Sequence, residues 1–206
     1  MSLKSFIQKY QNSILVFICI LVVFMILIMI RRHYNKNRGL VTVSNNGTSS
    51  SYTVAEAPDK EESIRLLAEI KSRLKYLIDY CIQQYPYHQN VQLLRQRFNP
   101  NNVQETSLYE SGTSYTIDKG KELRLCLRNK PNRNKHHDIN LLMFVAIHEL
   151  SHIMSVTYGH NAEFQNNFKF LLEKGVECNV YSPQNYYIHP VEFCGITVNS
   201  TPLFSP

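Results

Sequence analysis

Two histidines and a glutamate stand close together in the 206-residue chain, within the apolar run LLMFVAIHELSHIM. Positions i and i+4 share one face of a helix, so His148 and His152 can bind a single metal ion. Glu149 can then act on a metal-bound water as general base. The pattern H-E-x-x-H is a motif of zinc metalloproteases, and it predicts one Zn²⁺ per chain as cofactor.

A catalytic zinc site normally has three protein ligands, and His160 is the predicted third one. Gly159 precedes it and can end the motif helix in a left-handed conformation, which turns the chain back. Glu173 and Glu163 on the next helix are the rivals. Glu173 lies roughly 180° from the apolar stripe of that helix and should face solvent. Glu163 follows His160 too closely to be the simpler choice.

A single histidine on an apolar helix face is more often a core residue than a metal ligand. The combination of His148, Glu149, His152 and the Gly159-His160 turn favours the metal site. A glutamate among Leu142, Phe144, Val145 and Ile147 would be costly to bury without a metal or another partner. A bound metal explains why Glu149 is tolerated there.

The elements around the motif predict an α+β domain. Residues 58–84 have apolar side chains at helical spacing, which predicts a long amphipathic helix. Asp138 is a suitable N-cap for a motif helix that runs to about Tyr158. Asn161 and Gly175 mark the start and stop of the next helix. Extended pieces are expected at 114–117 and 122–128, and prolines exclude a long helix after residue 175.

The alternating strand before the motif helix has a functional interpretation. In peptidases of this kind, an edge strand beside the zinc helix pairs with the extended backbone of the substrate. Leu123–Leu127 is the candidate for that strand, although a purely structural strand would show the same alternation.

Residues 14–30 form an unbroken apolar run and predict a single-pass transmembrane helix. A cleaved signal peptide is the alternative, but the run is long and no small-x-small cleavage site follows it. The expected organisation is a short tail (1–13), the span (14–30), a basic juxtamembrane segment with a flexible linker (31–57), and a catalytic domain (58–206).

Charges beside the span predict its orientation. Lys and Arg follow it at four positions between residues 31 and 38, whereas only Lys4 and Lys9 precede it. The positive-inside rule therefore places the C-terminal domain in the cytoplasm. The cysteines show no disulfide-like spacing, which agrees with that placement. Glycosylation triplets at Asn46-Gly47-Thr48 and Asn199-Ser200-Thr201 would matter only in a lumenal domain.

The formal net charge is +6. Part of the excess is juxtamembrane and suits anionic lipid headgroups. Another part lies in residues 124–137, which include Arg128, Arg133 and Lys135. Such a run is usually a solvated loop, and its functional alternative is contact with nucleic acid or an acidic substrate.

Much of residues 60–175 resembles the WLM (Wss1-like) family of zinc metallopeptidases, which is related to the Spartan and SprT peptidases. The similar segments are ESIRLLAEIKSRLKYLI, YTIDKGKELRLCLR, FVAIHELSHIM and GHNAEFQNNFKFLL. The resemblance implies a zincin-like fold, zinc ligands at His148, His152 and His160, and a catalytic base at Glu149. The spacing from His152 to His160 is longer than the family pattern, and an N-terminal anchor is not typical of it. The tail HPVEFCGITV resembles proteins of large DNA viruses, which suggests a viral or infected-cell membrane.

These features predict a membrane-anchored zinc endopeptidase acting on a protein substrate. The oxyanion that forms during the reaction needs a hydrogen-bond donor besides zinc, and the candidates are Tyr158, Tyr186, Tyr187 and His189. One alternative is a catalytically inactive, zinc-stabilised interaction module tethered to the membrane. The other, implied by the family, is a DNA-associated protease acting on protein–DNA crosslinks.

Overall fold

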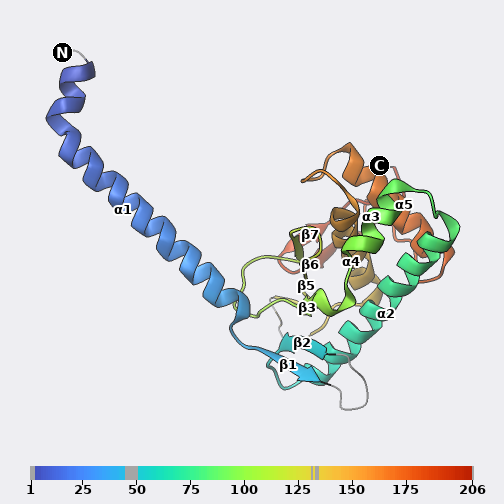
Figure 1. Ribbon diagram of the computed structural model, residues 1–206. Coiled ribbons are helices and arrows are strands. Elements are labelled where there is room, and N and C mark those ends of the chain that lie inside the picture. Colours follow the sequence, from blue (N-terminus) through green and yellow to red (C-terminus); the bar gives the residue numbers. More distant parts are fainter. Residues whose placement is uncertain (1–2, 45–50, 131, 133–134, 206) are drawn as a thin grey trace. The chain divides into compact units, whose positions relative to one another are not determined.

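The computed structural model describes residues 3–44, 51–130, 132 and 135–205. Two compact units make up the chain, Met1–Arg38 and Gly39–Pro206. The elements follow one another in the order α1 (Leu3–Asn37), β1 (Leu40–Ser44), β2 (Ser51–Ala55), α2 (Lys60–Gln84), α3 (Gln89–Arg97), a 3₁₀ turn (Pro100–Asn102), β3 (Val103–Glu105), β4 (Tyr115–Ile117), β5 (Glu122–Leu125), α4 (Ile139–Met154), α5 (Ala162–Glu177), β6 (Val191–Phe193) and β7 (Ile196–Val198) (Figure 1).

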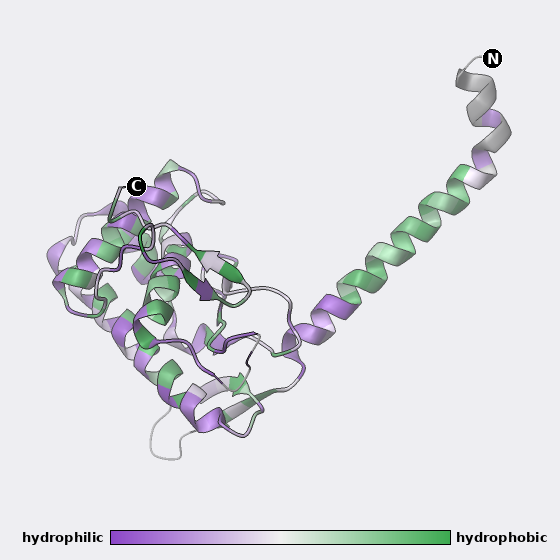
Figure 2. Cartoon of the chain, turned by 180° about the vertical axis from the view of Figure 1, so that it is seen from behind, coloured by the Kyte–Doolittle hydropathy of each residue, from purple (hydrophilic) through white to green (hydrophobic). Residues whose placement is uncertain are grey.

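The first unit is the single helix α1. Its central part is apolar over several turns, as the unbroken green stretch in Figure 2 shows. Ser13–Asn37 is long enough to cross a membrane and contains an 18-residue window with a mean hydropathy of 3.5, and it covers the predicted span 14–30. A signal sequence near the N-terminus can have the same length and composition.

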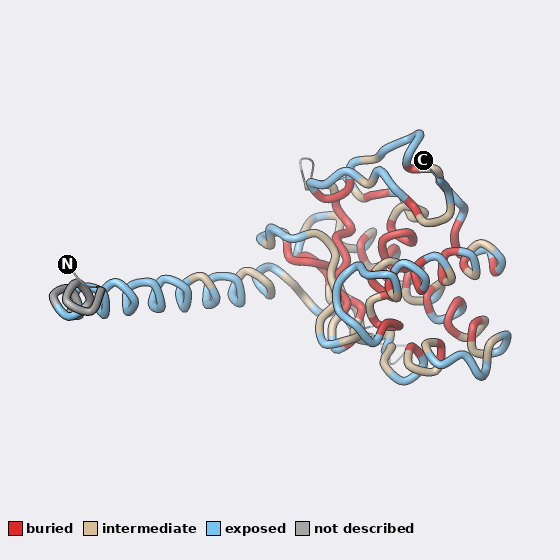
Figure 3. Tube along the Cα trace, turned by 90° about the horizontal axis from the view of Figure 1, so that it is seen from above, coloured by how far each residue is buried: buried red, intermediate tan, exposed pale blue. Residues whose placement is uncertain are grey.

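The second unit is a mixed α+β domain built around α2, α4 and α5. Buried residues (red in Figure 3) gather in the interior of this unit. The predicted amphipathic helix is confirmed as α2. The residues it buries are Ser63, Leu66, Leu67, Ile70, Leu74, Leu77, Ile78 and Cys81.

Helix α4 begins as predicted and ends earlier than predicted. The Asp138 carboxylate caps it by accepting a hydrogen bond from Asn140 N at 2.8 Å. The helix ends at Met154, not near Tyr158, and Ser155 is already extended at φ −83° and ψ 146°. Arg97 Nη1 donates to the carbonyl oxygens of Ile153 (3.0 Å) and Ser155 (2.9 Å). A side chain distant in sequence thus binds the last carbonyls of α4, which sequence periodicity cannot predict.

Helix α5 starts at the predicted cap and runs past the predicted stop. Asn161 Oδ1 accepts from Phe164 N at 3.1 Å, which confirms the N-cap. Gly175 does not end the helix, which continues to Glu177. A Cβ at Gly175 would lie 3.3 Å from Ile147 Cδ1, so the glycine marks the close approach of α5 to α4.

The main sheet has the order β3-β5-β4. Strand β3 is parallel to β5, and β4 is antiparallel to β5. Strand β5 is therefore central, and Leu123, Leu125 and Leu127 are buried. The prediction that Leu123–Leu127 forms a substrate-binding edge is wrong, because β3 and β4 already occupy both sides of β5. The edge strand of this sheet nearest the motif is β4.

The stretch expected to be a flexible linker contains a hairpin. Strands β1 and β2 pair antiparallel from Leu40↔Ala55 to Ser44↔Ser51. Val54 and Ala55 are fully buried, and Ala55 N donates to Glu105 Oε2 at 2.7 Å. The second unit thus begins at Gly39 instead of residue 58. The triplet Asn46-Gly47-Thr48 lies outside the described residues.

The helix α3 was not expected from the sequence. Its nine residues bury only Val91 and Leu94, which is too short a pattern to separate a helix from a loop. The side chain of His88, an unusual N-cap residue, accepts from Val91 N at 3.4 Å.

Cys126 and Cys194 form a disulfide across a separation of 68 residues. The expectation that the cysteines have no disulfide partner is therefore wrong for this pair. Spacing along the chain was uninformative because folding, not sequence proximity, brings the end of β5 next to the β6–β7 turn. Cys19, Cys81 and Cys178 have free thiols.

Candidate active site

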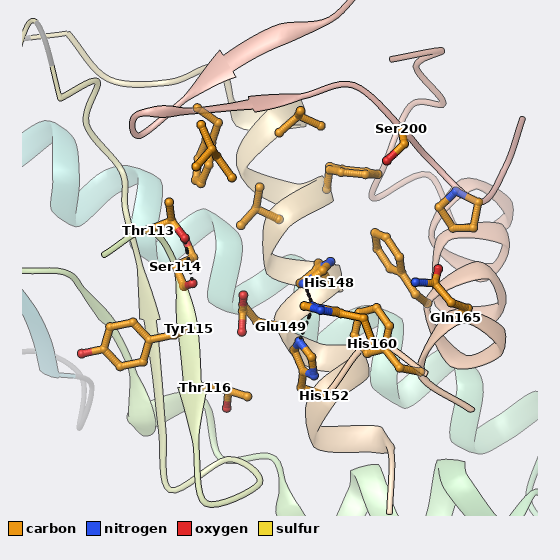
Figure 4. A pocket seen from close by; sticks show the side chains of 18 of the residues that line it. Thr113, Ser114, Tyr115, Thr116, His148, Glu149, His152, His160, Gln165 and Ser200 are labelled. Carbon is orange, nitrogen blue, oxygen red and sulfur yellow. Dashed lines mark hydrogen bonds between the residues drawn. The ribbon is translucent and has the colours of Figure 1, made fainter. Parts of the chain in front are cut away.

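Three histidines converge on one point between α4 and α5. Residues 148 and 152 lie one helical turn apart on α4, and residue 160 reaches them from the following loop (Figure 4). The Nε2 atom of His160 lies 3.0 Å from that of His148 and 3.1 Å from that of His152. One nitrogen from each ring lies within 4.8 Å of the other two, which makes the three residues a candidate metal-binding group.

The three imidazoles fit a metal ion. Nitrogens bound to one tetrahedral zinc are roughly 3.3 Å apart, close to the distances seen here. Burial, with smaller contributions from the neighbouring histidines, lowers the pKa of His148 to about 3. The same causes, together with Lys119, lower the pKa of His152 to about 4. Both rings are therefore neutral near pH 7 and have a lone pair available for a metal.

One aromatic ring supports all three histidines. The Phe164 ring centroid lies 4.8 Å from that of His148, 4.3 Å from that of His152 and 4.7 Å from that of His160. Phe164 is 1% exposed, so its ring is fixed by the core beneath the cluster. The packing limits rotation of the imidazoles and keeps their nitrogens directed at the common point.

Glu149 lies beside the cluster and is 5% exposed. Its Oε2 atom is buried and has no hydrogen-bond partner among the described residues. Burial raises the pKa of this carboxyl to about 8. Figure 4 shows its carboxyl between the segment Thr113–Thr116 and the histidines. A carboxyl in this position can exchange a proton with a molecule bound in the adjoining cleft.

A cleft of about 720 Å³ contains the cluster. One wall is the segment around β4, from Thr113 to Lys119, and another is the C-terminal segment from Phe193 to Pro202. Among the described residues, β4 pairs with no strand other than β5. An unpaired strand edge beside the histidines provides backbone groups that can pair with an extended peptide.

The four candidate oxyanion donors separate into two groups. Tyr158 and Tyr187 line the cleft. Tyr186 is 3% exposed and packs on Phe144 at 4.7 Å, and His189 is not part of the cleft lining. Tyr158 and Tyr187 therefore remain candidate oxyanion donors, whereas Tyr186 and His189 do not line the cleft.

The two rival metal ligands are not directed at the histidines. Glu173 is exposed on α5, as the sequence predicted. The carboxylate of Glu163 instead accepts from the backbone N–H groups of Val156 (2.7 Å) and Thr157 (2.9 Å). Glu163 and Lys119 form hydrogen bonds with the loop that carries His160. The sequence motif does not predict these contacts, because they exist only after the loop has folded.

Two arginines of the basic stretch 124–137 are buried, whereas Lys135 is exposed. Arg124 and Arg128 are 4% and 3% exposed. Arg128 Nε lies 3.0 Å from Glu105 Oε1, and its Nη1 lies 2.5 Å from Asp59 Oδ1. These two arginines are therefore not available to a phosphate backbone, and Arg133 lies outside the described residues.

No family model matches the sequence. Among solved structures, a crystal structure of Wss1 from Saccharomyces cerevisiae is similar, with a TM-score of 0.45 and 18% identity over 60% of this chain and 84% of that chain. A crystal structure of a Wss1 mutant gives a TM-score of 0.47 over 60% of this chain and 85% of that chain.

Two viral proteins are similar in sequence. Uncharacterized protein 136R of Invertebrate iridescent virus 6 is 30% identical over 145 residues, which are 66% of this chain and 74% of that protein. Uncharacterized protein R325 of Acanthamoeba polyphaga mimivirus is 35% identical over 162 residues, which are 76% of this chain and 81% of that protein. This identity, over most of both proteins, shows that the chain belongs to the family of mimivirus protein R325.

Proposed function

We propose that this protein is a zinc-dependent endopeptidase. The observation that carries the proposal is the convergence of His148, His152 and His160 beside the buried, unpartnered carboxyl of Glu149. A metal site that served only to stabilise the fold would not need a carboxyl buried next to it. Burying an unpartnered carboxyl lowers the stability of the fold, and a chemical role explains why it is tolerated here.

The three histidine Nε2 atoms would hold the zinc ion. When bound, zinc would act as a Lewis acid toward a water molecule and the scissile carbonyl. The positive charge of the bound metal would favour the ionised form of Glu149, whose carboxylate would accept a proton from the attacking water. Glu149 then donates that proton to the nitrogen of the leaving amine. Tyr158 and Tyr187 are the cleft residues whose hydroxyls can donate to the oxyanion.

The substrate is a protein segment in extended conformation. Support comes from the edge of β4, which borders the cleft and offers backbone hydrogen-bonding groups over residues 113–117. Because such pairing uses only the backbone, it provides affinity for many sequences. The side chains along the cleft then select among them.

Residues 14–30 anchor the enzyme in a membrane. The flanking Lys and Arg residues support a cytoplasmic catalytic domain, whereas the Cys126–Cys194 disulfide is typical of oxidising compartments and argues against it.

Asn199 is exposed and begins a glycosylation triplet. Expression with microsomes distinguishes the two, since a lumenal domain gains a glycan that Asn199→Gln removes. The viral origin of the two relatives supports a membrane of an infected cell.

Zinc content tests the metal site. We expect about one zinc per full-length chain in detergent, measured by elemental analysis, and a large loss in His160→Ala. His189→Ala is the matched control, since His189 is exposed and lies outside the cleft lining. A folded parent chain without zinc after reconstitution would overturn the proposal.

Glu149→Gln tests the catalytic role separately. The variant should keep its zinc and lose cleavage of an unfolded protein substrate by several orders of magnitude, because the amide cannot accept the proton. Equal cleavage by the parent and Glu149→Gln would exclude Glu149 as the base. Zinc binding without cleavage in the parent would favour the inactive interaction module.

A further inference from the structure

The loop that carries His160 is short and exposed, and Phe164 is the apolar side chain described above that packs against its histidine. It joins Met154, the last residue of α4, to Ala162, the first residue of α5. Its residues from Val156 to Asn161 are all exposed. Gly159 has a φ of +82°, and nothing lies within 4 Å of the position of a Cβ there. Phe164 packs on the ring of His160, but the backbone of the loop that carries this ring is held by polar contacts.

Glu163 provides several of these contacts from the first turn of α5. Its Oε1 accepts from Val156 N at 2.7 Å, and its Oε2 accepts from Thr157 N at 2.9 Å. The Thr157 hydroxyl also donates to Oε2. Asn161 Nδ2 in turn donates to Thr157 Oγ1 at 2.7 Å, which connects this network to the residue after His160.

Lys119 holds the carbonyl side of the same loop. Its Nζ donates to Thr157 O at 2.5 Å and to His152 O at 3.2 Å. The ammonium also lies 4.3 Å from the centroid of the Tyr158 ring. Thr157 is thus bound through its N–H by a carboxylate and through its C=O by an ammonium. Lys119 also connects the loop to the backbone of His152.

We infer that Glu163 is a positioning residue for His160, acting with Lys119 through the backbone of Thr157. The inference rests on the proposed metal site and extends it to residues outside the ligand set. Both Glu163 oxygens are engaged by the loop, so the residue stabilises the ligand arrangement without joining it. Residues that orient metal ligands in this way typically change metal affinity by about 10–100-fold when substituted.

The test compares zinc affinities of full-length variants in detergent, measured by competition with a chromophoric chelator. Glu163→Gln keeps the size of the side chain but replaces one acceptor oxygen by an NH₂ group, which cannot accept from a backbone N–H. We expect its Kd for zinc to rise about 10–100-fold. Glu173→Gln is the matched control because it lies on the same helix with its side chain exposed, and its Kd should equal that of the parent.

Cobalt substitution gives a readout that a change in stability alone would not move. The visible absorption of bound Co²⁺ reports coordination number, so the Glu163→Gln spectrum should shift toward that of His160→Ala. Lys119→Met, which removes the contacts on the carbonyl side, should change zinc affinity in the same direction. It also serves as the second variant if Glu163→Gln does not fold.

Two results would overturn the inference, and they have different consequences. If Glu163→Gln and Lys119→Met bind zinc and cobalt as the parent does, His160 is positioned without them, while the proposed function stands. If the folded parent binds neither metal, the proposed function fails and the inference fails with it.

Discussion

Arg128 illustrates how the position of a single residue decides its role. It belongs to a basic run that sequence patterns associate with solvent or nucleic acid, yet its side chain is 3% exposed. Its guanidinium contacts Glu105, Asp59 and Ser63, three residues far away in sequence. Burial raises the pKa of Glu105, and the hydrogen bond from Ala55 N and the charge of Arg128 oppose that shift.

The first prediction concerns this buried ion pair. Arg128→Met should lower the free energy of unfolding by about 3–5 kcal/mol, because Glu105 would be left buried without its partner. Urea unfolding followed by circular dichroism measures the loss. Arg65→Met is the control, since Arg65 is 61% exposed and pairs with Glu62 within the same helix. Equal unfolding midpoints for the parent and Arg128→Met would mean that the pair contributes nothing net.

At the residue scale, the proposed catalytic base Glu149 shows a different kind of burial. Glu149 is buried without a hydrogen-bond partner, and the histidines beside it have depressed pKa values. Arrangements of this kind are unfavourable for stability and are found where chemistry requires them. The contrast with Glu105, which is equally buried but paired, separates a carboxylate with a structural role from one available for proton transfer.

At the scale of elements, the turn between β4 and β5 connects the sheet to the loop that carries His160. Asp118, Lys119 and Gly120 all have positive φ, at 45°, 54° and 108°. This tight turn directs Lys119 toward the loop and leaves β4 at the edge of the cleft. A Cβ at Gly120 would lie 2.8 Å from the carbonyl oxygen of Arg97, the residue that binds the end of α4.

The second prediction concerns this turn. Gly120→Ala should destabilise the domain by more than about 1 kcal/mol, because alanine is strained at positive φ and the methyl group would contact backbone that cannot easily move. Gly112→Ala is the matched control, since nothing lies within 4 Å of its Cβ position. Thermal unfolding of both variants measures the difference. A Gly120→Ala chain as stable as Gly112→Ala would contradict the strain argument.

At the scale of the whole molecule, the disulfide connects two distant parts of the second unit. Cys126 directly follows β5, and Cys194 lies in the β6–β7 turn with a φ of +48°. Residues from Phe193 to Pro202 form one wall of the cleft. The covalent link therefore holds a wall of the cleft against the central strand of the sheet.

The third prediction is that reduction weakens this part of the molecule. Cys126→Ser combined with Cys194→Ser should lower the free energy of unfolding by about 2–4 kcal/mol, because the crosslink no longer restricts the unfolded chain. Cys19→Ser, in α1 and exposed, is the control. Alkylation of the denatured, unreduced protein should modify three cysteines, namely Cys19, Cys81 and Cys178. Modification of all five would show that the disulfide does not form.

The candidate site could be recognised in the linear sequence, because the spacing of His148, Glu149 and His152 on one helix is a local property. The apolar run at 14–30, the long helix α2 and the caps at Asp138 and Asn161 are also local, and each agrees with the structure. Short elements such as α3 and the β1–β2 hairpin were missed because a few residues hold too little periodic signal.

Contacts between distant residues were decided only in the folded chain. These are the central place of β5, the edge position of β4, the end of α4 at Arg97, the pairing of Cys126 with Cys194, and the burial of Arg128. Each depends on residues separated by many positions, whose approach reflects packing of the whole domain rather than any local pattern. The sequence thus predicted the residues of the candidate site, and tertiary packing determined which strand, loop and side chains surround them.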